Sequence, residues 1–302
     1  MKKDDQFNEA IVPSEDVVDG YSLSPLQQAM LFHTLREQGI GMYISQAVSR
    51  HEKLDCDAFQ KAWQLVVDRH DILRTSFHWD DPENPVQKVH RNVAIPFFSL
   101  DWRGLSPSEQ NSRLRKLQRE EREKGFDLTQ PTQLMVTAIQ ITRSRWFCLQ
   151  THHHIILDGW SGALLAQEVG RAYDAYNNGR APSWEQPAQF GAYIRWIEAQ
   201  DLAAARSFWK KHLEGVSFPT SLPGEREPDP RYRRKTHVES WDITLDDDDA
   251  DRVKHFARKC RVTLNTVIQS VWPLVLSRYS GQKSVIFGLL VSGRPPELEG
   301  VE

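Results

Sequence analysis

The sequence predicts a protein of mixed helices and strands, of the α/β or α+β class, arranged as a pair of lobes. Segments with helical periodicity alternate with strand-like segments up to residue 180, and a second series of both kinds follows. Pro182 and Pro187 separate the two series, and 302 residues are enough for two domains of ordinary size. We therefore expect a flexible segment over residues 1–20, a first lobe over 21–180 and a second lobe over 181–302.

The composition is that of a globular protein with nearly balanced charge. A net charge of −3 gives no general attraction to nucleic acid or to an anionic membrane. No stretch is long and apolar enough to cross a bilayer, and the first residues lack the apolar core of a signal peptide. Cys56, Cys148 and Cys260 lie far apart in apolar patterns, which favours buried thiols over a disulfide framework. We expect a cytoplasmic protein with neither a nucleic-acid nor a membrane partner.

Start and stop signals place the helices of the first lobe. Ser24 followed by a proline predicts a helix start, Asp55 precedes a strongly periodic helix, and Ser106 with Glu109 forms a capping box. The helix that follows Ser106 should end before Gly125. Strands are expected over residues 43–50, 73–79, 86–89, 133–142 and 145–151, with the last two joined as a hairpin.

The second lobe is predicted to contain further helices and strands. Thr263 should cap one helix, which carries Pro273 in its interior and is therefore expected to kink. The expected elements, in order, are helices over 190–199 and 202–213, a charged loop over 219–235, a strand over 238–245, a helix after the acidic run 246–249, a helix over 264–279 and a buried strand over 284–290.

The segment Thr151–Ser161 is where we expect the chemistry. An apolar strand runs into it and a helix follows, so a short connection carries His153 and His154 to a helix start. A helix start has unpaired N–H groups and a partial positive charge, and an imidazole exchanges a proton near neutral pH. Neighbouring side chains of an extended segment point in opposite directions, so one histidine should face the site while the other packs. His152 is interpreted as structural.

Other chemistries have weaker support in the sequence. Adjacent histidines rarely bind one ion together, and no other histidine, cysteine or aspartate has ligand spacing, so we expect no metal site. The acidic run 246–249 lacks the pattern of a calcium loop. Cys148 lies in an apolar strand that should raise its pKa, so we interpret it as a core residue and not as a nucleophile.

The histidine segment resembles the hallmark of the condensation domains of nonribosomal peptide synthetases, His-His-Xaa3-Asp-Gly. The matching residues are His153, His154, Asp158 and Gly159, followed as in the family by Trp160 and Ser161. Weaker family motifs are matched in the expected order at Ser24–Phe32, Arg69–Phe77, Tyr193–Trp196 and Ser292–Pro295. The resemblance covers about residues 20–302, and the motifs together are highly specific.

This resemblance implies two lobes with the chloramphenicol-acetyltransferase fold, set in a V with a tunnel between them. Family members continue well past the segment that is matched at 292–295, through motifs that this sequence lacks. The resemblance therefore implies that the first lobe is complete and that the second lobe is cut short.

By the same resemblance, the chain forms peptide bonds. Donor and acceptor peptidyl carrier proteins, beside an adenylation domain, would present a donor acyl or peptidyl thioester and an aminoacyl acceptor on phosphopantetheine arms, with no cofactor bound directly. His154 is the family's candidate for accepting or orienting the proton of the attacking α-amine, and the Gly159 N–H could stabilise the oxyanion. Ester formation, epimerisation and a non-catalytic docking module for carrier proteins remain alternatives.

Asp158 is expected to be structural and not part of a proton relay. The resemblance points to Arg294 as its partner, with Arg74 as the second choice, in a buried pair that ties the two lobes together. The residues expected to support the active site are thus His153, Asp158, Arg294, Arg74, Trp160 and Ser161.

Overall fold

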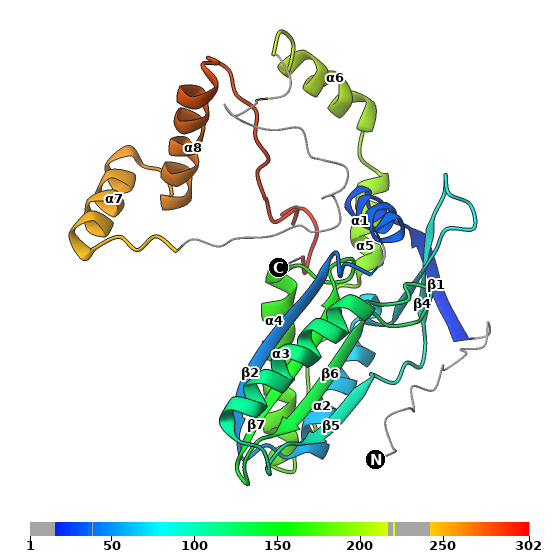
Figure 1. Cartoon of the computed structure of the whole chain (residues 1–302). Coiled ribbons are helices and arrows are strands. Elements are labelled where there is room, and N and C mark those ends of the chain that lie inside the picture. The colour runs from blue at the N-terminus through cyan, green and yellow to red at the C-terminus, as the bar shows by residue number, and fades with distance from the viewer. Residues whose placement is uncertain (1–15, 38, 217–219, 221–241, 302) are drawn as a thin grey trace. The chain divides into compact units, whose positions relative to one another are not determined.

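The computed structural model describes residues 16–37, 39–216, 220 and 242–301 (Figure 1). The chain divides into two compact units, Met1–Gln200 with Gly293–Glu302 and Asp201–Ser292. This division differs from the expected boundary at residue 180, because residues 181–200 and the last ten residues group with the first unit.

The first unit is built around a four-stranded sheet with the order β2-β7-β6-β5. β2, β7 and β6 are antiparallel neighbours, and β5 joins β6 in parallel. The predicted hairpin is present as β6 and β7, whereas β5 is absent from the predicted strands. A parallel pair joins segments that are distant in sequence, so no hairpin turn marks β5. The strands are β2 (Ile44–Glu52), β5 (Phe97–Asp101), β6 (Leu134–Gln140) and β7 (Arg145–His153).

Helices cover both faces of this sheet (Figure 1). α3 packs on one face, where Leu114 meets Phe147 of β7 in a small core. α2 and α4 cover the other face, where Val66 and Leu165 belong to the main core together with Cys148 of β7. Side chains alternate along a strand, which is why Phe147 and its neighbour Cys148 lie in different cores. The helices are α2 (Cys56–Arg69), α3 (Pro107–Lys124) and α4 (Gly159–Asn177).

The predicted helix starts of this unit are confirmed. α1 (Pro25–Arg36) begins with a capping box in which Ser24 and Gln27 bond reciprocally, and Ser106 forms the same motif at α3. The Asp55 carboxylate accepts the Ala58 N–H at 3.0 Å at the start of α2. These caps satisfy N–H groups that a helix leaves unpaired at its first turn.

A second sheet, with the order β1-β4-β3, lies in the same unit. The prediction of a flexible segment over residues 1–20 is wrong for residues 17–20, because they lie in β1 and β1 pairs with β4. Residues 1–15 lie outside the described residues. The Ser22 hydroxyl donates to the Glu198 carboxylate at 2.6 Å, which links β1 to the helix α5. The bounds are β1 (Val17–Ser22), β3 (Thr75–His78), β4 (Val86–His90) and α5 (Phe190–Glu198).

The second unit contains three described helices, all of them predicted: α6 (Leu202–His212), α7 (Asp247–Cys260) and α8 (Leu264–Ser280). Thr263 caps α8 and Pro273 lies inside it, as expected. Asp246 is the N-cap of α7, and three further aspartates occupy its first turn, where they complement the helix dipole. Among all described residues, no helix is long and apolar enough to span a membrane.

The strands expected in the second unit differ from the structure. The prediction of a buried strand over 284–290 is wrong, because the segment has no strand and Leu290 is 98% exposed. A strand needs a neighbouring strand for its backbone groups, and no described strand pairs with this segment. The strand expected over 238–245 lies partly outside the described residues, and residues 242–245 contain no strand. Apart from Thr220, the expected loop over 219–235 also lies outside them.

Candidate active site

The histidine pair lies where the sequence predicts it, between the end of β7 at His153 and the start of α4 at Gly159. The His153 side chain is fully buried, and His154 is partly exposed. The two neighbours therefore have different environments. His153 packs in the interior, as expected of one member of the pair, and His154 is the more accessible of the two. His152 is also buried, in agreement with a structural role.

Hydrogen bonds fix the tautomer of His153. Its Nδ1 accepts the Ile155 N–H at 3.0 Å, so this nitrogen carries no proton. Its Nε2 lies 3.0 Å from the Thr34 hydroxyl, which already donates its one proton to the Met30 carbonyl at 2.8 Å. The hydroxyl can only accept from His153, and the ring is therefore neutral with its proton on Nε2.

Burial reinforces this neutral state. Desolvation first, and then the neighbouring His154 and His152 rings, lower the pKa of His153 to about 4. Burial and His154 likewise lower the pKa of His152 to about 4. Because a buried charge without a partner is costly, both rings stay neutral near pH 7.

His154 is held through its backbone, and its ring has fewer hydrogen bonds than the ring of His153. Its N–H donates to the Tyr43 carbonyl at 2.7 Å. Tyr43 has the left-handed conformation (φ 59°), which is uncommon for a residue with a side chain. The His154 Nδ1 is buried and has no hydrogen-bond partner among the residues that the structure describes. Nε2 is therefore the ring nitrogen that is left to meet a substrate.

The predicted pair of Asp158 and Arg294 is present. The Arg294 guanidinium donates to both carboxylate oxygens of Asp158, at 3.1 and 3.3 Å, and to the Ser161 hydroxyl at 2.9 Å. Its Nε donates to the Val301 carbonyl at 3.2 Å, and its Cζ lies 5.9 Å from the centre of the Trp160 ring. One arginine thus connects the first turn of α4 with the segment 293–301.

Two features of this pair differ from the expectation. The Arg294 side chain is 12% exposed but that of Asp158 is 47% exposed, so the pair is only partly buried. Both residues belong to the first unit, so the pair secures the segment 293–301 within that unit. Partial burial alone would raise the pKa of Asp158, but hydrogen bonds from Arg294 and Ser161 outweigh it and leave the pKa below its usual value.

The start of α4 leaves N–H groups available beside the histidine loop. The Asp158 carboxylate accepts the Ser161 N–H at 2.7 Å, and the first N–H groups of α4, those of Gly159 and Trp160, have no partner inside the helix. A Cβ added at Gly159 would meet nothing within 4 Å. The space that a Gly159 side chain would fill is therefore open.

Arg74, the second choice for Asp158, lies elsewhere in the unit. Its guanidinium bonds with the Asp71 carboxylate and the His90 carbonyl. Arg74 thus pairs within the 3₁₀ helix Asp71–Arg74 and its neighbour β4, and the structure does not bring it to the histidine loop.

Two side chains that hold this loop, Gln27 and Thr34 of α1, were not predicted from the sequence. Gln27 donates to the Ile155 carbonyl at 3.1 Å, and Thr34 accepts from His153. Gln27 falls inside the segment Ser24–Phe32 that resembles a family motif, which is a signal that could have drawn attention to it. Thr34 lies outside this segment, and no pattern in the sequence marks it.

Cysteine chemistry is not favoured at the site. Cys148 is buried in β7, and burial raises the pKa of its thiol to about 12, as expected of a core residue. The expectation that all three thiols are buried is wrong, because Cys56 is half-buried and Cys260, the last residue of α7, is exposed. Among the described residues, no three histidine, cysteine or acidic side chains form a metal-binding group.

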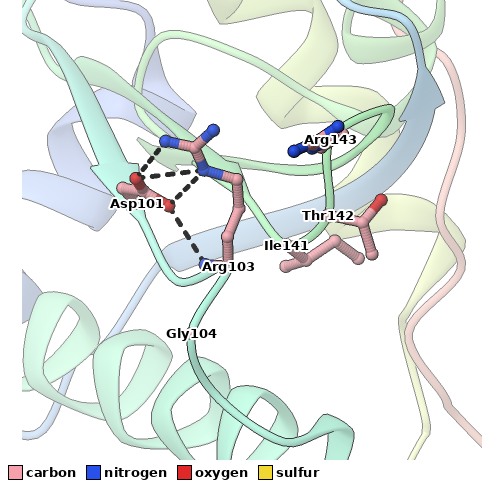
Figure 2. Close-up of a pocket in the computed structure, with 6 residues that line it drawn as sticks. All are labelled: Asp101, Arg103, Gly104, Ile141, Thr142 and Arg143. Atoms are coloured by element: carbon pink, nitrogen blue, oxygen red, sulfur yellow. Dashed lines mark hydrogen bonds and ion pairs between the residues drawn. The ribbon is translucent and has the colours of Figure 1, made fainter.

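A pocket of about 640 Å³ lies at the other end of the sheet, between the end of β5 and the turn from β6 to β7 (Figure 2). Arg103, which lines it, is paired with Asp101 at 2.6 Å, while Arg143 comes from the turn. The first eight residues of β7 lie between this turn and His153, which corresponds to roughly 30 Å at the usual rise of a strand. The pocket is therefore not part of the histidine site.

Comparison with known proteins identifies the family. A family model described as the condensation domain matches residues 17–302. The chain belongs to the condensation-domain family. One of the linear gramicidin synthase proteins of Brevibacillus parabrevis is 38% identical over 282 residues, which is 93% of this chain and 5% of that protein. Bacitracin synthase 1 from Bacillus licheniformis is 31% identical over 93% of this chain and 5% of its own length.

Solved structures show the same fold. The starter condensation domain of rhizomide synthetase RzmA has a TM-score of 0.61 and 21% identity, over 68% of this chain and 50% of that chain. The cyclization-docking bidomain of the synthetase EpoB from Sorangium cellulosum has a TM-score of 0.70 and 21% identity, over 89% of this chain and 53% of that chain. The chain thus has the fold of condensation domains and spans about half the length of these two solved chains.

Proposed function

We propose that this condensation domain forms an amide bond between two carrier-bound substrates, and that His154 is its catalytic residue. The observation that carries the proposal is the place of His154. Its partly exposed side chain stands on a loop that Tyr43, Gln27 and Thr34 hold by hydrogen bonds, close in sequence to the helix start at Gly159. The matched family model and the similarity to peptide synthases support the reaction class.

In the proposed reaction, the nitrogen of the acceptor α-amine attacks the carbonyl carbon of the donor thioester. Nε2 of His154 accepts a hydrogen bond from the amine and takes its proton as the C–N bond forms, and the C–S bond then breaks. The proton passes to the departing thiolate, so the products are an amide and a free phosphopantetheine thiol. A neutral imidazole is suited to this task because the amine has to attack without its extra proton.

The helix start supplies the remaining chemistry. We place the donor carbonyl beside the N–H of Gly159, at the positive end of the α4 dipole, in the open space where a Gly159 side chain would stand. A donor carbonyl bound there develops negative charge that the N–H stabilises. The Asp158–Arg294 pair holds this turn, and Asp158 takes no part in proton transfer.

Two glycine variants of the first turn of α4 test the proposal. An added Cβ meets nothing within 4 Å at either Gly159 or Gly162, so Gly159→Ala and Gly162→Ala are both expected to fold normally. Amide formation between a loaded donor carrier and a loaded acceptor carrier should fall at least ~10-fold in Gly159→Ala, because the methyl group occupies the carbonyl site. Gly162→Ala should retain the rate. Equal rates in the two variants, or no amide product with both loaded carriers, would contradict the proposal.

A further inference from the structure

The loop that carries His154 is held mainly by α1, which contacts the residue on each side of it. Thr34 accepts the Nε2–H of His153 at 3.0 Å, and Gln27 donates to the Ile155 carbonyl at 3.1 Å. The two side chains lie seven residues apart on α1, or two helical turns, so both can reach the same loop. His154 itself is not touched by either side chain in any described contact.

Gln27 belongs to a closed network of buried amides. The Gln27 and Gln87 side chains donate to each other's oxygen at 3.3 and 3.1 Å, and both residues are at most 4% exposed. The second N–H of Gln87 bonds to the Ser22 carbonyl at 2.8 Å, and the Gln27 oxygen accepts the Ser24 N–H at 3.0 Å. Every amide N–H of the two glutamines thus has an acceptor.

This network fixes the direction of the Gln27 amide. Rotating the amide by 180° would place its oxygen against the Ile155 carbonyl and its NH₂ group against the Ser24 N–H. Two acceptors would then face each other, and so would two donors, which buried groups do not tolerate. The Ile155 carbonyl is therefore presented with a donor in a single orientation, backed by β4 through Gln87.

From these contacts we propose that Gln27 and Thr34 are positioning residues, which hold His153 and Ile155 so that the His154 ring has one orientation. This inference rests on the proposed role of His154. Small misplacements of a reacting group reduce rates strongly, so rigid support on both sides of the residue serves the chemistry directly. Thr34 also sets the tautomer of His153, whose Nδ1 must be free of a proton to accept the Ile155 N–H.

Near-isosteric variants test this assignment in the full natural protein. Gln27→Met removes the amide and keeps the length of the side chain, and Thr34→Val removes only the hydroxyl. Each should lower kcat for amide formation at least ~10-fold while KM for the loaded carriers changes less than about twofold. Thr34→Ser keeps the hydroxyl and should restore kcat. Thr34→Val is the smaller change and gives the result on its own should Gln27→Met fail to fold.

Gln64→Met is the matched control for a purely structural effect. Gln64 of α2 donates to the Val93 carbonyl at 2.8 Å and accepts the Ile95 N–H at 3.0 Å, so it also bonds to a loop at both ends of its amide. This variant should lose stability without losing kcat. Unchanged kcat in Gln27→Met and Thr34→Val, or a loss of kcat in Gln64→Met as large as theirs, would overturn the assignment.

Nuclear magnetic resonance of the histidine rings provides a readout that does not depend on activity. The wild-type protein and Thr34→Ser should give one set of His154 ring signals and the Nε2–H tautomer of His153, whereas Gln27→Met and Thr34→Val should give several sets or a changed tautomer. Ring signals that match the wild type in both variants would also overturn the assignment. If His154→Ala forms the amide at the wild-type rate, the proposed function fails instead. The two proposals can therefore be refuted separately.

Discussion

The Asp158–Arg294 pair gives a prediction whose magnitude follows from its exposure. Breaking a fully buried pair costs about 3–5 kcal/mol, while an exposed pair contributes about 0–1 kcal/mol. Here the arginine is 12% exposed but the carboxylate is 47% exposed, and the contact is bidentate. We therefore expect a coupling energy of about 1–2 kcal/mol between the two side chains, which lies between these limits.

A double-mutant cycle measures this coupling. The cycle compares Asp158→Asn, Arg294→Gln and the double variant with the wild type, using the free energy of unfolding or of local opening from hydrogen exchange in the first turn of α4. Arg294→Ala should cost more, about 2 kcal/mol, because it also removes the bonds to Ser161 and to the Val301 carbonyl.

The coupling energy should also depend on the salt concentration and on the type of cationic side chain. Because Asp158 is half exposed, the coupling should weaken between low salt and about 1 M salt. Arg294→Lys should recover only part of it, since an ammonium cannot match the two oxygens of the carboxylate in a planar fork. A coupling energy below about 0.3 kcal/mol at low salt, or one of the size of a buried pair, would show that the pair does not have the partly buried character described here.

Three further predictions concern single side chains. The pKa of His153 is about 4 in the folded state, against about 6.5 when unfolded. As the pH falls from 6.5 toward 4, the unfolded state takes up this proton first, so about 3 kcal/mol of the free energy of unfolding is lost. His153→Asn should therefore lose less stability than the wild type between pH 7 and pH 4 in urea unfolding, and an identical pH profile would contradict this. A thiol reagent at pH 8 should modify Cys260 rapidly and leave Cys148 unmodified until the protein unfolds, as followed by mass spectrometry. Asp55→Ala should destabilise α2 by about 1 kcal/mol, while Asp55→Asn, which preserves an acceptor for the Ala58 N–H, should cost much less in the same unfolding assay.

Local signals were sufficient to predict much of the first unit from its sequence. The helix starts at Ser24, Asp55 and Ser106 depend on residues within three positions of the cap, and the hairpin of β6 and β7 depends on one turn. The position of the histidine pair at the end of a strand follows from the same kind of signal. Such features can be predicted because the interacting groups are close in sequence.

The features that were missed depend on contacts between distant residues. β5 gains its place by parallel pairing with β6, and β1 by pairing with β4 about 70 residues later. The apolar run at 284–290 has the composition of a buried strand, yet no described strand pairs with it, because composition alone does not supply a neighbour.

The side chains that hold the histidine loop were also difficult to predict, because their contacts join residues that are distant in sequence. Gln27 and Gln87 are 60 residues apart, and two glutamines carry no pattern that predicts a reciprocal pair. The partner of Asp158 was predicted through the resemblance to a family, whereas the half-exposed state of its carboxylate follows only from the packing around it.

The most direct test of the proposed role of His154 is the rate of amide formation by His154→Ala in the full natural protein, with loaded donor and acceptor carriers. We expect a loss of at least ~100-fold in kcat, the usual scale for a positioned acid–base group, with unchanged binding of both carriers. His154 has no described side-chain hydrogen bond, so its removal should not unfold the loop. Transfer near the wild-type rate by a folded His154→Ala protein would contradict the central claim that this ring handles the proton of the attacking amine.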